Sequence, residues 1–260
     1  MAAAFRTLHE SPPLLLPNAW DAASAAAIES GGAAAIATTS AGIAWARGTT
    51  DGEQLGRDRM LQALTEIVAA VRAPVTADIE SGYGVDPDDV AVTIRALIGI
   101  GVAGINIEDS PGADGPLRAP SIQAARIGAV RATADRAGVP LWINARTDVF
   151  LTDTGALAEL LRETGERAAV YAAAGADSLF VPGVADLGVI RDLTAGPLPI
   201  NVMVGSGSPD GASLAQAGVA RVSLGPAIAQ AAYGLATRAT RELLHDGTYT
   251  ALDDPLARSH

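Results

Sequence analysis

The sequence predicts an α/β fold, a (β/α)8 TIM barrel that spans residues 1–260 as a single domain. Eight times along the chain, a short apolar run ends in polar or charged residues and is followed by a helical pattern. Several helical segments close on a glycine that directly precedes the next apolar run. The chain contains no glycine-rich phosphate turn, so a closed barrel is favoured over an open doubly wound sheet.

The predicted strands are short apolar runs of the kind found in buried parallel sheets. In chain order they are Leu14–Pro17, Ala34–Thr38, Val75–Ile79, Gly104–Ile107, Leu141–Asn144, Ser178–Val181, Ile200–Val204 and Arg221–Leu224. Between them, apolar residues recur at helical spacing, as at Leu61, Leu64 and Val68. Strand and helix therefore alternate along the whole chain.

The helix boundaries carry their own signals. Asp86 followed by Pro87 is typical of a helix start, because aspartate caps the first turn and proline suits the first helical position. Gly31, Gly101, Gly138, Gly175 and Gly218 are expected to end helices just before strands. The last helix is predicted from about Ala227 to Asp246, as part of a C-terminal helical extension over about 227–260.

The composition excludes several classes of chemistry. Cysteine is absent and all 18 basic residues are arginine, so neither a thiol nor a lysine Schiff base can take part in catalysis. The formal charge of −11 and the lack of a basic run argue against nucleic acid or an anionic membrane as a partner. The amino terminus has no signal-peptide pattern, so a cytoplasmic location without a membrane segment is expected.

The active site of such a barrel forms where the strands end. Asp78 and Glu80 close the third predicted strand, two residues apart on one face, and Glu108 with Asp109 closes the fourth. Converging carboxylates need a cation, and oxygen ligands without histidine or cysteine favour Mg²⁺ or Mn²⁺. We expect Asp78 to bind the ion directly, with Glu80 and Glu108 acting directly or through water. The alternative is that these acids cap helices or pair with arginines.

Other strand ends supply candidates for substrate binding and catalysis. Arg146 ends the fifth strand and suits bidentate capture of an anion; a structural salt bridge is an equal alternative, and the two roles can coexist. Ser40, Ala41 and Gly42 form a small-residue turn whose N–H groups could cradle an anionic oxygen.

Three further residues complete the set of candidates. Asn201 is read as a strand-end substrate ligand. Because His9, His245 and His260 lie near the termini, proton transfer would fall to carboxylates, to metal-bound water or to Tyr83, although packing is the more common role of such a tyrosine. Asp51 lies in a loop, where it is either solvated or able to reach the water shell of the metal.

Five motifs in order, PNAWDAASA, TTSAG, ADIESGYG, GINIED and NARTD, resemble the strand ends of the isocitrate lyase and phosphoenolpyruvate mutase superfamily. The resemblance implies a barrel enzyme that uses Mg²⁺ and acts on small 2-oxo acids. It implies that Ser40–Gly42 bind a substrate carboxylate, that Asp78 binds the metal with Asp51, Glu80 and Glu108 organising its waters, and that Arg146 contacts substrate. It also implies a homotetramer, a dimer of dimers, in which the last helices are exchanged between subunits.

The chain departs from this pattern after the fourth strand, where Ser110–Arg118 contains neither the lyase cysteine motif nor the mutase lysine. We therefore expect a C–C bond lyase or decarboxylase that acts on an oxaloacetate-like 2-oxo acid through an enolate. One alternative is a mutase or hydrolase of the P–C bond in phosphonopyruvate or phosphoenolpyruvate. Another is a non-catalytic barrel that binds a 2-oxo acid.

Overall fold

Nine parallel strands form one nearly closed sheet in the order β1-β9-β8-β7-β6-β5-β4-β3-β2 in the computed structural model, which describes residues 1–111, 115–152 and 154–253. β1 pairs with β9 and β2 pairs with β3, and only Pro17 separates β1 from β2. The two short segments thus act as one strand that joins both ends of the sheet, because proline has no N–H to continue a ladder. Each of the eight predicted runs overlaps a strand, and β2 lies just beyond the first run, Leu14–Pro17.

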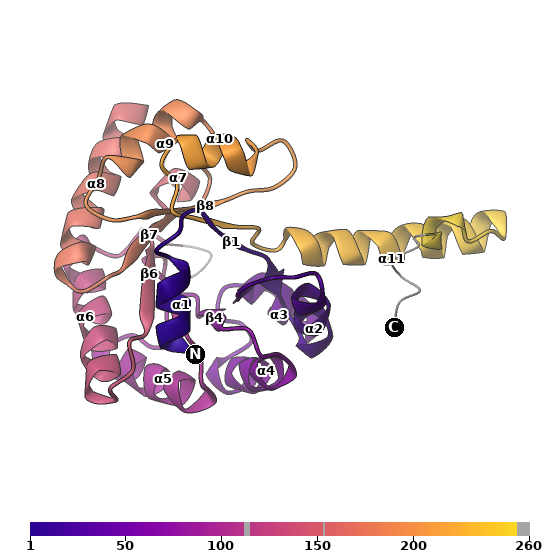
Figure 1. The fold of residues 1–260 in the computed structure, drawn as a ribbon, viewed down its shortest axis with the longest axis horizontal. Helices are drawn as coiled ribbons and strands as arrows, with labels where there is room; N and C mark the ends of the chain where they lie inside the picture. Colours follow the sequence, from indigo (N-terminus) through magenta and orange to yellow (C-terminus); the bar gives the residue numbers. More distant parts are fainter. Residues whose placement is uncertain (112–114, 153, 254–260) are drawn as a thin grey trace.

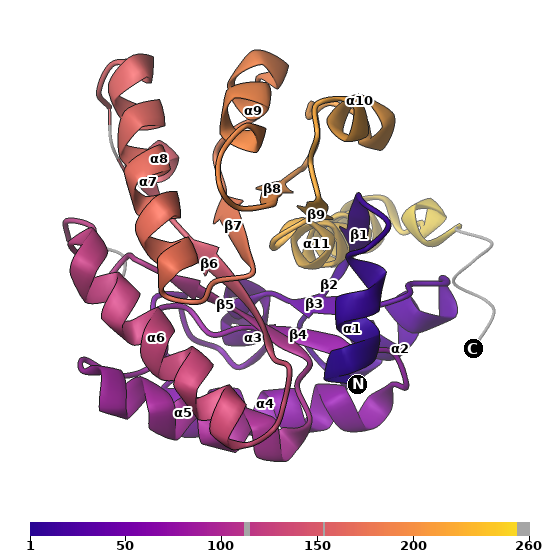
Figure 2. The same cartoon turned by 60° about the vertical axis from the view of Figure 1, so that its left-hand side comes forward.

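The element bounds agree with the alternation that the sequence predicts. The strands are β1 (Leu14–Leu16), β2 (Asn18–Ala19), β3 (Ile36–Thr38), β4 (Val75–Asp78), β5 (Gly104–Glu108), β6 (Trp142–Arg146), β7 (Ser178–Val181), β8 (Ile200–Met203) and β9 (Arg221–Ser223). The helices are α1 (Ala2–Leu8), α2 (Ala22–Ser30), α3 (Ser40–Ala46), α4 (Arg57–Ala70), α5 (Pro87–Ile100), α6 (Pro120–Arg136), α7 (Val149–Thr152), α8 (Leu157–Ala173), α9 (Leu187–Thr194), α10 (Gly211–Gln216) and α11 (Ala227–Asp246), followed by the 3₁₀ turn η1 (Thr250–Leu252). The helices from α2 to α10 surround the sheet (Figures 1 and 2).

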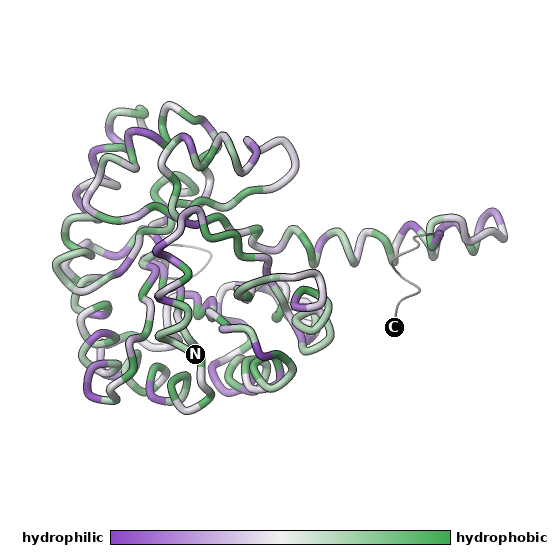
Figure 3. The backbone as a smooth tube through the Cα atoms, in the orientation of Figure 1, coloured by the Kyte–Doolittle hydropathy of each residue, from purple (hydrophilic) through white to green (hydrophobic). Residues whose placement is uncertain are grey.

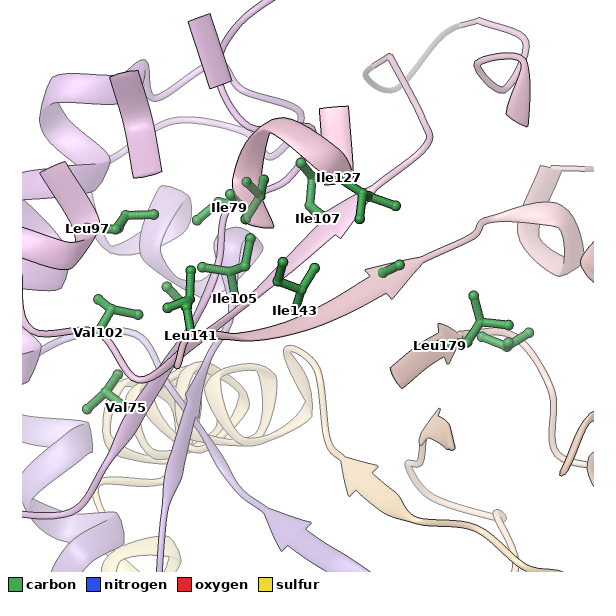
Figure 4. Close-up of a cluster of buried hydrophobic side chains, with 14 of the residues drawn as sticks. Val75, Ile79, Leu97, Val102, Ile105, Ile107, Ile127, Leu141, Ile143 and Leu179 are labelled. Atoms are coloured by element: carbon green, nitrogen blue, oxygen red, sulfur yellow. The ribbon is translucent and has the colours of Figure 1, made fainter. Parts of the chain in front are cut away.

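The main apolar core lies between the sheet and the surrounding helices. Ile105, Ile107 and Ile143 are fully buried and belong to one cluster with Leu97 of α5 and Ile127 of α6 (Figure 4). Because side chains alternate along a strand, the residues between these isoleucines point into the barrel. The strands can therefore bury apolar residues outside and still carry polar ones inside.

The barrel interior is polar at mid-height. Asn144 donates to Asn106 Oδ1 (2.8 Å) and to Asn201 Oδ1 (2.9 Å), and it accepts from Ser178 (2.7 Å). Arg221 donates to Asn106 Oδ1 at 3.1 Å. Buried polar groups of this kind must find partners, so the network holds five neighbouring strands in one arrangement.

Helix α1 closes the barrel at the end where the strands begin. Phe5 is fully buried against the starts of the strands, and His9 stacks on Trp142 with ring centroids 3.6 Å apart. Arg6 and Arg131 both bind Asp177, at 2.6 and 2.5 Å. The amino-terminal segment therefore seals this end and leaves the opposite end open for a site.

Helix α11 begins and ends where the sequence predicts, but it leaves the barrel as an arm (Figure 1). Ala229 is its one buried residue among those described, while Leu243 and Leu244 are exposed. Hydrophobic segments recur along the arm in Figure 3. In the part of the chain that the structure describes, no helix is long and apolar enough to cross a membrane.

We expect His9 to make the fold sensitive to acid. Burial lowers the pKa of the imidazole to about 4, below the unfolded value of 6.5. The unfolded chain then binds the proton better, so the contribution is complete above pH 6.5 and is lost as the pH falls toward 4. After discounting for partial exposure, the loss is on the order of 1 kcal/mol.

Urea unfolding at pH 7 and pH 4.5 checks this prediction. His9→Phe keeps an aromatic ring beside Trp142 and should lose less unfolding free energy between the two pH values than the parent. His245→Phe, at an exposed position on α11, is the matched control. Equal pH dependence in the parent and in His9→Phe would contradict the assignment.

Candidate active site

A pocket of about 210 Å³ opens at the end of the barrel where the strands terminate. Its lining is mainly charged or hydroxyl-bearing and consists of Ser40, Asp51, Gly52, Glu80, Glu108, Ser110, Arg146, Asp148, Leu151 and Thr152. A larger hollow of about 500 Å³ beside β1 and α2 contains no titratable side chain. The acidic pocket is therefore the candidate for chemistry, since convergent polar groups mark functional sites better than size does.

Asp78 is the last residue of β4 and lies beside the start of α3. Ser40 Oγ donates to its Oδ2 at 3.2 Å, and the amide of Glu80 donates to its Oδ1 at 3.3 Å. The amide of Asp78 itself donates to Thr38 Oγ1 at 2.9 Å. Burial raises the pKa of Asp78, and the positive charge of Arg146 opposes that shift.

Glu80 is held by a loop that carries unusual backbone geometry. Tyr83 Oη donates to its Oε1, and the amide of Glu53 donates to its Oε2. Glu53 Oε1 in turn accepts from Ser81 Oγ at 2.7 Å and from the amide of Tyr83 at 2.8 Å. Glu53, Glu80 and Tyr83 all have positive φ, a strained state for residues other than glycine. Such strain is concentrated at sites where orientation matters.

The electrostatics of Glu80 follow from this arrangement. Burial raises its pKa to about 7, and the hydrogen bond from Tyr83 holds the pKa lower than burial alone would. Burial and the nearby Glu80 carboxylate raise the pKa of Tyr83. Tyr83 therefore stays protonated and acts as a donor to Glu80.

Arg146 ends β6 and is fixed by two carboxylates. Its Nε and Nη2 donate to Asp148 at 2.6 and 3.0 Å, and its Nη1 lies 2.7 Å from Glu108 Oε2. Burial raises the pKa of Glu108 well above its usual range despite Arg146. Burial would lower the pKa of Arg146, but the surrounding acids outweigh it and raise it. The salt bridge and the position in the pocket, which the sequence left as alternatives, occur together.

Some of the other predicted site residues line the pocket and others do not. Asp51 lines the pocket, and its charge contributes to the raised pKa of Glu80. Ser40, Ala41 and Gly42 form the first turn of α3 instead of a free turn, and the amide of Gly42 is directed to Thr39 Oγ1 at 3.4 Å. Ser40 alone of the three lines the pocket.

Asn201 lies inside the barrel, fully buried, and does not line the pocket. Its amide donates to the carbonyl of Val202 at 2.8 Å, and its Oδ1 accepts from Asn144. It occupies the second position of β8, so its side chain lies below the rim. A strand run predicted from sequence does not show how far each residue rises along the barrel axis.

The acids do not form a ready-made metal cage. Over residues 1–111, 115–152 and 154–253, no group of three or more His, Cys, Asp or Glu is arranged to hold an ion. One sequence expectation was that Asp78, Glu80 and Glu108 all bind the ion directly. These three carboxylates are not grouped in that way, because Glu108 pairs with Arg146 and Glu80 accepts from Tyr83 and Glu53. Within the described residues, the carboxylate of Asp78 accepts from Ser40 and from the amide of Glu80, which leaves it able to offer an oxygen.

The charge balance of the pocket nevertheless fits a hard divalent cation. Asp51, Glu80, Glu108 and Asp148 line it, Asp78 borders it, and Arg146 is the one cation among its lining residues. Burial raises the pKa values of Asp78, Glu80 and Glu108, and repulsion from neighbouring carboxylates adds to each shift. Oxygen donors without nitrogen or sulfur match Mg²⁺ or Mn²⁺.

Sequence reasoning did not single out Glu53 or the pocket residues Gly52, Ser110, Leu151 and Thr152. Glu53 stands two positions after Asp51 in a loop, and only the folded loop brings it to Ser81 and Tyr83. Leu151 and Thr152 belong to α7, which starts directly after the NARTD motif. Both residues follow a strand end within one helical turn, and that position would have indicated them as pocket residues.

Comparison with known proteins gives a consistent family. The family model described as phosphoenolpyruvate phosphomutase matches residues 5–244. A solved candidate phosphonomutase from Burkholderia cenocepacia J2315 is 48% identical, covers 95% of this chain and 98% of its own, and superposes with a TM-score of 0.87. An uncharacterised Mycobacterium tuberculosis protein is 37% identical over 84% of this chain and 79% of its own length.

Two relatives with named activities match about half of this chain each. A 2-methylisocitrate lyase of Escherichia coli K12 is 32% identical over 52% of this chain and 45% of its own length. An oxaloacetate decarboxylase of Rhodopseudomonas palustris BisA53 is 37% identical over 49% of this chain and 45% of its own length. These relatives span C–C lyase, decarboxylase and phosphonomutase assignments.

The hydrogen bond from Tyr83 should set the proton affinity of Glu80. Tyr83→Phe removes a donor to the charged carboxylate and should raise the pKa of Glu80 above about 7. Carboxyl ¹³C NMR of metal-free protein measures it, with Glu80→Gln to assign the resonance and Tyr249→Phe, at an exposed position, as control. An unchanged or lower midpoint in Tyr83→Phe would rule out this role.

Proposed function

This chain belongs to the phosphoenolpyruvate mutase/isocitrate lyase superfamily, and from that premise we propose that it is a Mg²⁺-dependent enzyme for a small 2-oxo carboxylic acid. The proposed reaction is cleavage or decarboxylation of a C–C bond through an enolate, on an oxaloacetate-like substrate. The observation that carries the proposal is the set of buried carboxylates gathered around Arg146 at the barrel rim.

The size and lining of the pocket support a small anionic substrate. About 210 Å³ is below the ~300 Å³ at which pockets for drug-sized ligands begin. The hydroxyls of Ser40, Ser110 and Thr152 donate to Asp78, to the Asp148 carboxylate and to the Asp148 carbonyl, so each would bind a carboxylate or oxo oxygen by exchanging that partner. Leu151 supplies the one large apolar side chain of the lining and would exclude water on its side.

In the proposed reaction, each residue of the site would have a separate role. Asp78 would hold the ion, with Asp51, Glu80 and Glu108 orienting its waters. Ser40 would bind the substrate carboxylate, and the guanidinium of Arg146 would face the negative charge that develops on the enolate oxygen. When bound, Mg²⁺ supplies a Lewis acid that polarises the oxo group and stabilises that charge. Tyr83 keeps Glu80 oriented through its hydrogen bond.

Loss of Asp78 should abolish turnover. We expect Asp78→Ala to lower kcat/KM by about 10³-fold or more on the 2-oxo acid that the parent turns over, because the direct ligand is lost. Asp58→Ala, at an exposed position of α4, should leave activity unchanged. A panel of 2-oxo acids followed by ¹H NMR, with and without EDTA and added Mg²⁺, is the measurement.

The same panel distinguishes the alternatives. Full activity in EDTA contradicts the proposed metal dependence. Binding without turnover, weakened but not lost in Asp78→Ala, indicates a non-catalytic 2-oxo acid-binding barrel. No binding and no turnover of any acid removes the proposed function.

A second candidate is P–C bond chemistry on phosphonopyruvate or phosphoenolpyruvate. It is supported by the phosphoenolpyruvate phosphomutase family match and by 48% identity to the candidate phosphonomutase. Arg118, whose Nη1 donates to the carbonyl of Ser110 at 2.6 Å, is a cation beside the pocket that could attract a phosphonate. ³¹P NMR of either compound incubated with the Mg²⁺-loaded protein separates this chemistry from C–C cleavage.

We also infer that α11 is exchanged between subunits of a homotetramer built as a dimer of dimers. The arm buries only Ala229 against its own chain within the described residues, and Leu244 is 76% exposed. A 20-residue helix with apolar side chains and no core of its own is stabilised by packing against another surface. A second copy of this chain is the proposed partner.

Charge on the arm should disrupt this assembly. Leu243→Glu/Leu244→Glu is expected to convert the tetramer to smaller species, because burying two carboxylates at an interface is unfavourable. Light scattering coupled to size-exclusion chromatography measures the mass. Leu157→Glu, on α8 and 49% exposed, is the matched control and should keep the parent mass. A parent that is monomeric at all concentrations contradicts the inference.

A further inference from the structure

Behind the pocket, Asp109 follows Glu108 directly and faces the other way. Strand alternation turns its carboxylate from the barrel interior toward the helical layer, where it is fully buried. Oδ2 accepts from Arg167 Nη1 at 2.9 Å and from Tyr171 Oη at 2.8 Å. Oδ1 accepts from the backbone amide of Asp148 at 3.1 Å. One carboxylate thus joins a helix to the residue that holds Arg146.

Arg167 and Tyr171 lie four residues apart on one face of α8. Arg167 is 4% exposed and also donates to Glu163 at 3.0 and 2.7 Å and to the carbonyl of Arg118 at 2.8 Å. Tyr171 is fully buried and lies 3.2 Å from Arg167 Nη1. The donors around Asp109 are therefore held in place by their own packing and hydrogen bonds.

The connection continues from Asp148 into the pocket. With its amide fixed by Asp109, the Asp148 carboxylate binds Arg146 in bidentate fashion at 2.6 and 3.0 Å and accepts from Ser110 Oγ at 2.5 Å. The amide of Asp109 also donates to the carbonyl of Arg146 at 3.2 Å. Asp109 thereby contacts the backbone of Arg146 through its own amide, and its carboxylate is connected to the guanidinium of Arg146 through Asp148.

Stability alone does not account for this cluster. A buried ion pair loses solvation, and apolar residues of similar volume in its place are often as stable or more so. A group that must be held to a fraction of an ångström, in contrast, needs neighbours that fix it from behind. Arg146 is such a group if it faces charge that develops on the substrate.

We propose that Asp109, Arg167 and Tyr171 form a positioning cluster that sets the orientation of Arg146 through Asp148. None of the three lines the pocket, so each acts through another residue. The expected effect on turnover rests on the proposed function, whereas the expected effect on the position of the Arg146 side chain does not.

The test uses the full chain with two variants and one control. Tyr171→Phe keeps the ring and removes one donor to Asp109, and Asp109→Asn keeps an acceptor for Asp148 but replaces Oδ2 with an NH₂ group. Thr164→Val is the control, because Thr164 is fully buried on the same helix and its hydroxyl has no partner among the described residues. Thermal unfolding establishes that each variant folds.

The first readout is geometric and independent of activity. Crystal structures and the ¹⁵N–¹H resonance of Arg146 Nε should show the bond to Asp148 Oδ1, 2.6 Å in the parent, lengthened or divided between conformers in Asp109→Asn and unchanged in Thr164→Val. A folded Asp109→Asn protein in which Arg146 keeps its parent position overturns the proposal.

The second readout is kinetic, on the acid that the parent turns over. We expect kcat to fall about 10-fold in Tyr171→Phe and about 100-fold in Asp109→Asn, with KM within about 2-fold. In an Arg146→Lys background, Tyr171→Phe should have little further effect, because residues that act as a unit are not additive. Equal losses in both backgrounds overturn the proposal. If the parent turns over no substrate, the proposed function fails and the geometric readout alone decides the positioning role.

Discussion

The pairing of Arg146 with Glu108 and Asp148 is the interaction around which the open end of this barrel is organised. The guanidinium lies between two buried carboxylates at 2.7 and 2.6 Å, and removing it would take from both the positive charge with which they pair. Burial raises the pKa of Glu108 and of Asp78 even with Arg146 present. Asp51, Asp78, Glu80, Glu108 and Asp148 lie at or beside the pocket with one arginine among its described lining residues, and this set of oxygen donors fits a hard divalent cation.

This charge can gather at one end because the barrel buries apolar side chains outside the sheet and polar side chains inside it. Ile105 and Ile107 pack outward under α5 and α6, while Asn106, between them, joins the polar network inside. The outer layer supplies the apolar burial that stabilises the sheet. The strand ends are then free to present side chains whose burial is costly, and Glu108 and Asp109 use opposite faces of one strand, one toward the pocket and one toward α8.

The acids of the rim are also connected to elements far from it. Glu53 and Tyr83 hold Glu80 from two loops, and Asp109 links α8 to the residue that binds Arg146. α11, in contrast, has few such connections, because it leaves the barrel and buries little against its own chain. The barrel supplies a pocket by itself, whereas the arm has apolar surface that only a further surface can cover.

The sequence by itself determined the eight strand-helix units and the rim positions of Asp78, Glu80, Glu108 and Arg146, because alternation along a strand is local and a strand end is marked by the change from apolar to polar residues. It left open whether Arg146 faces the pocket, pairs with an acid or does both, and it grouped Asn201 with the rim residues. Only the tertiary structure decided that Arg146 does both and that Asn201 lies inside the barrel. It also brought Glu53 to Tyr83 and Asp109 to Arg167. The physical reason is that barrel stagger, loop conformation and side-chain rotamers depend on contacts between residues distant in the chain, which no local pattern contains.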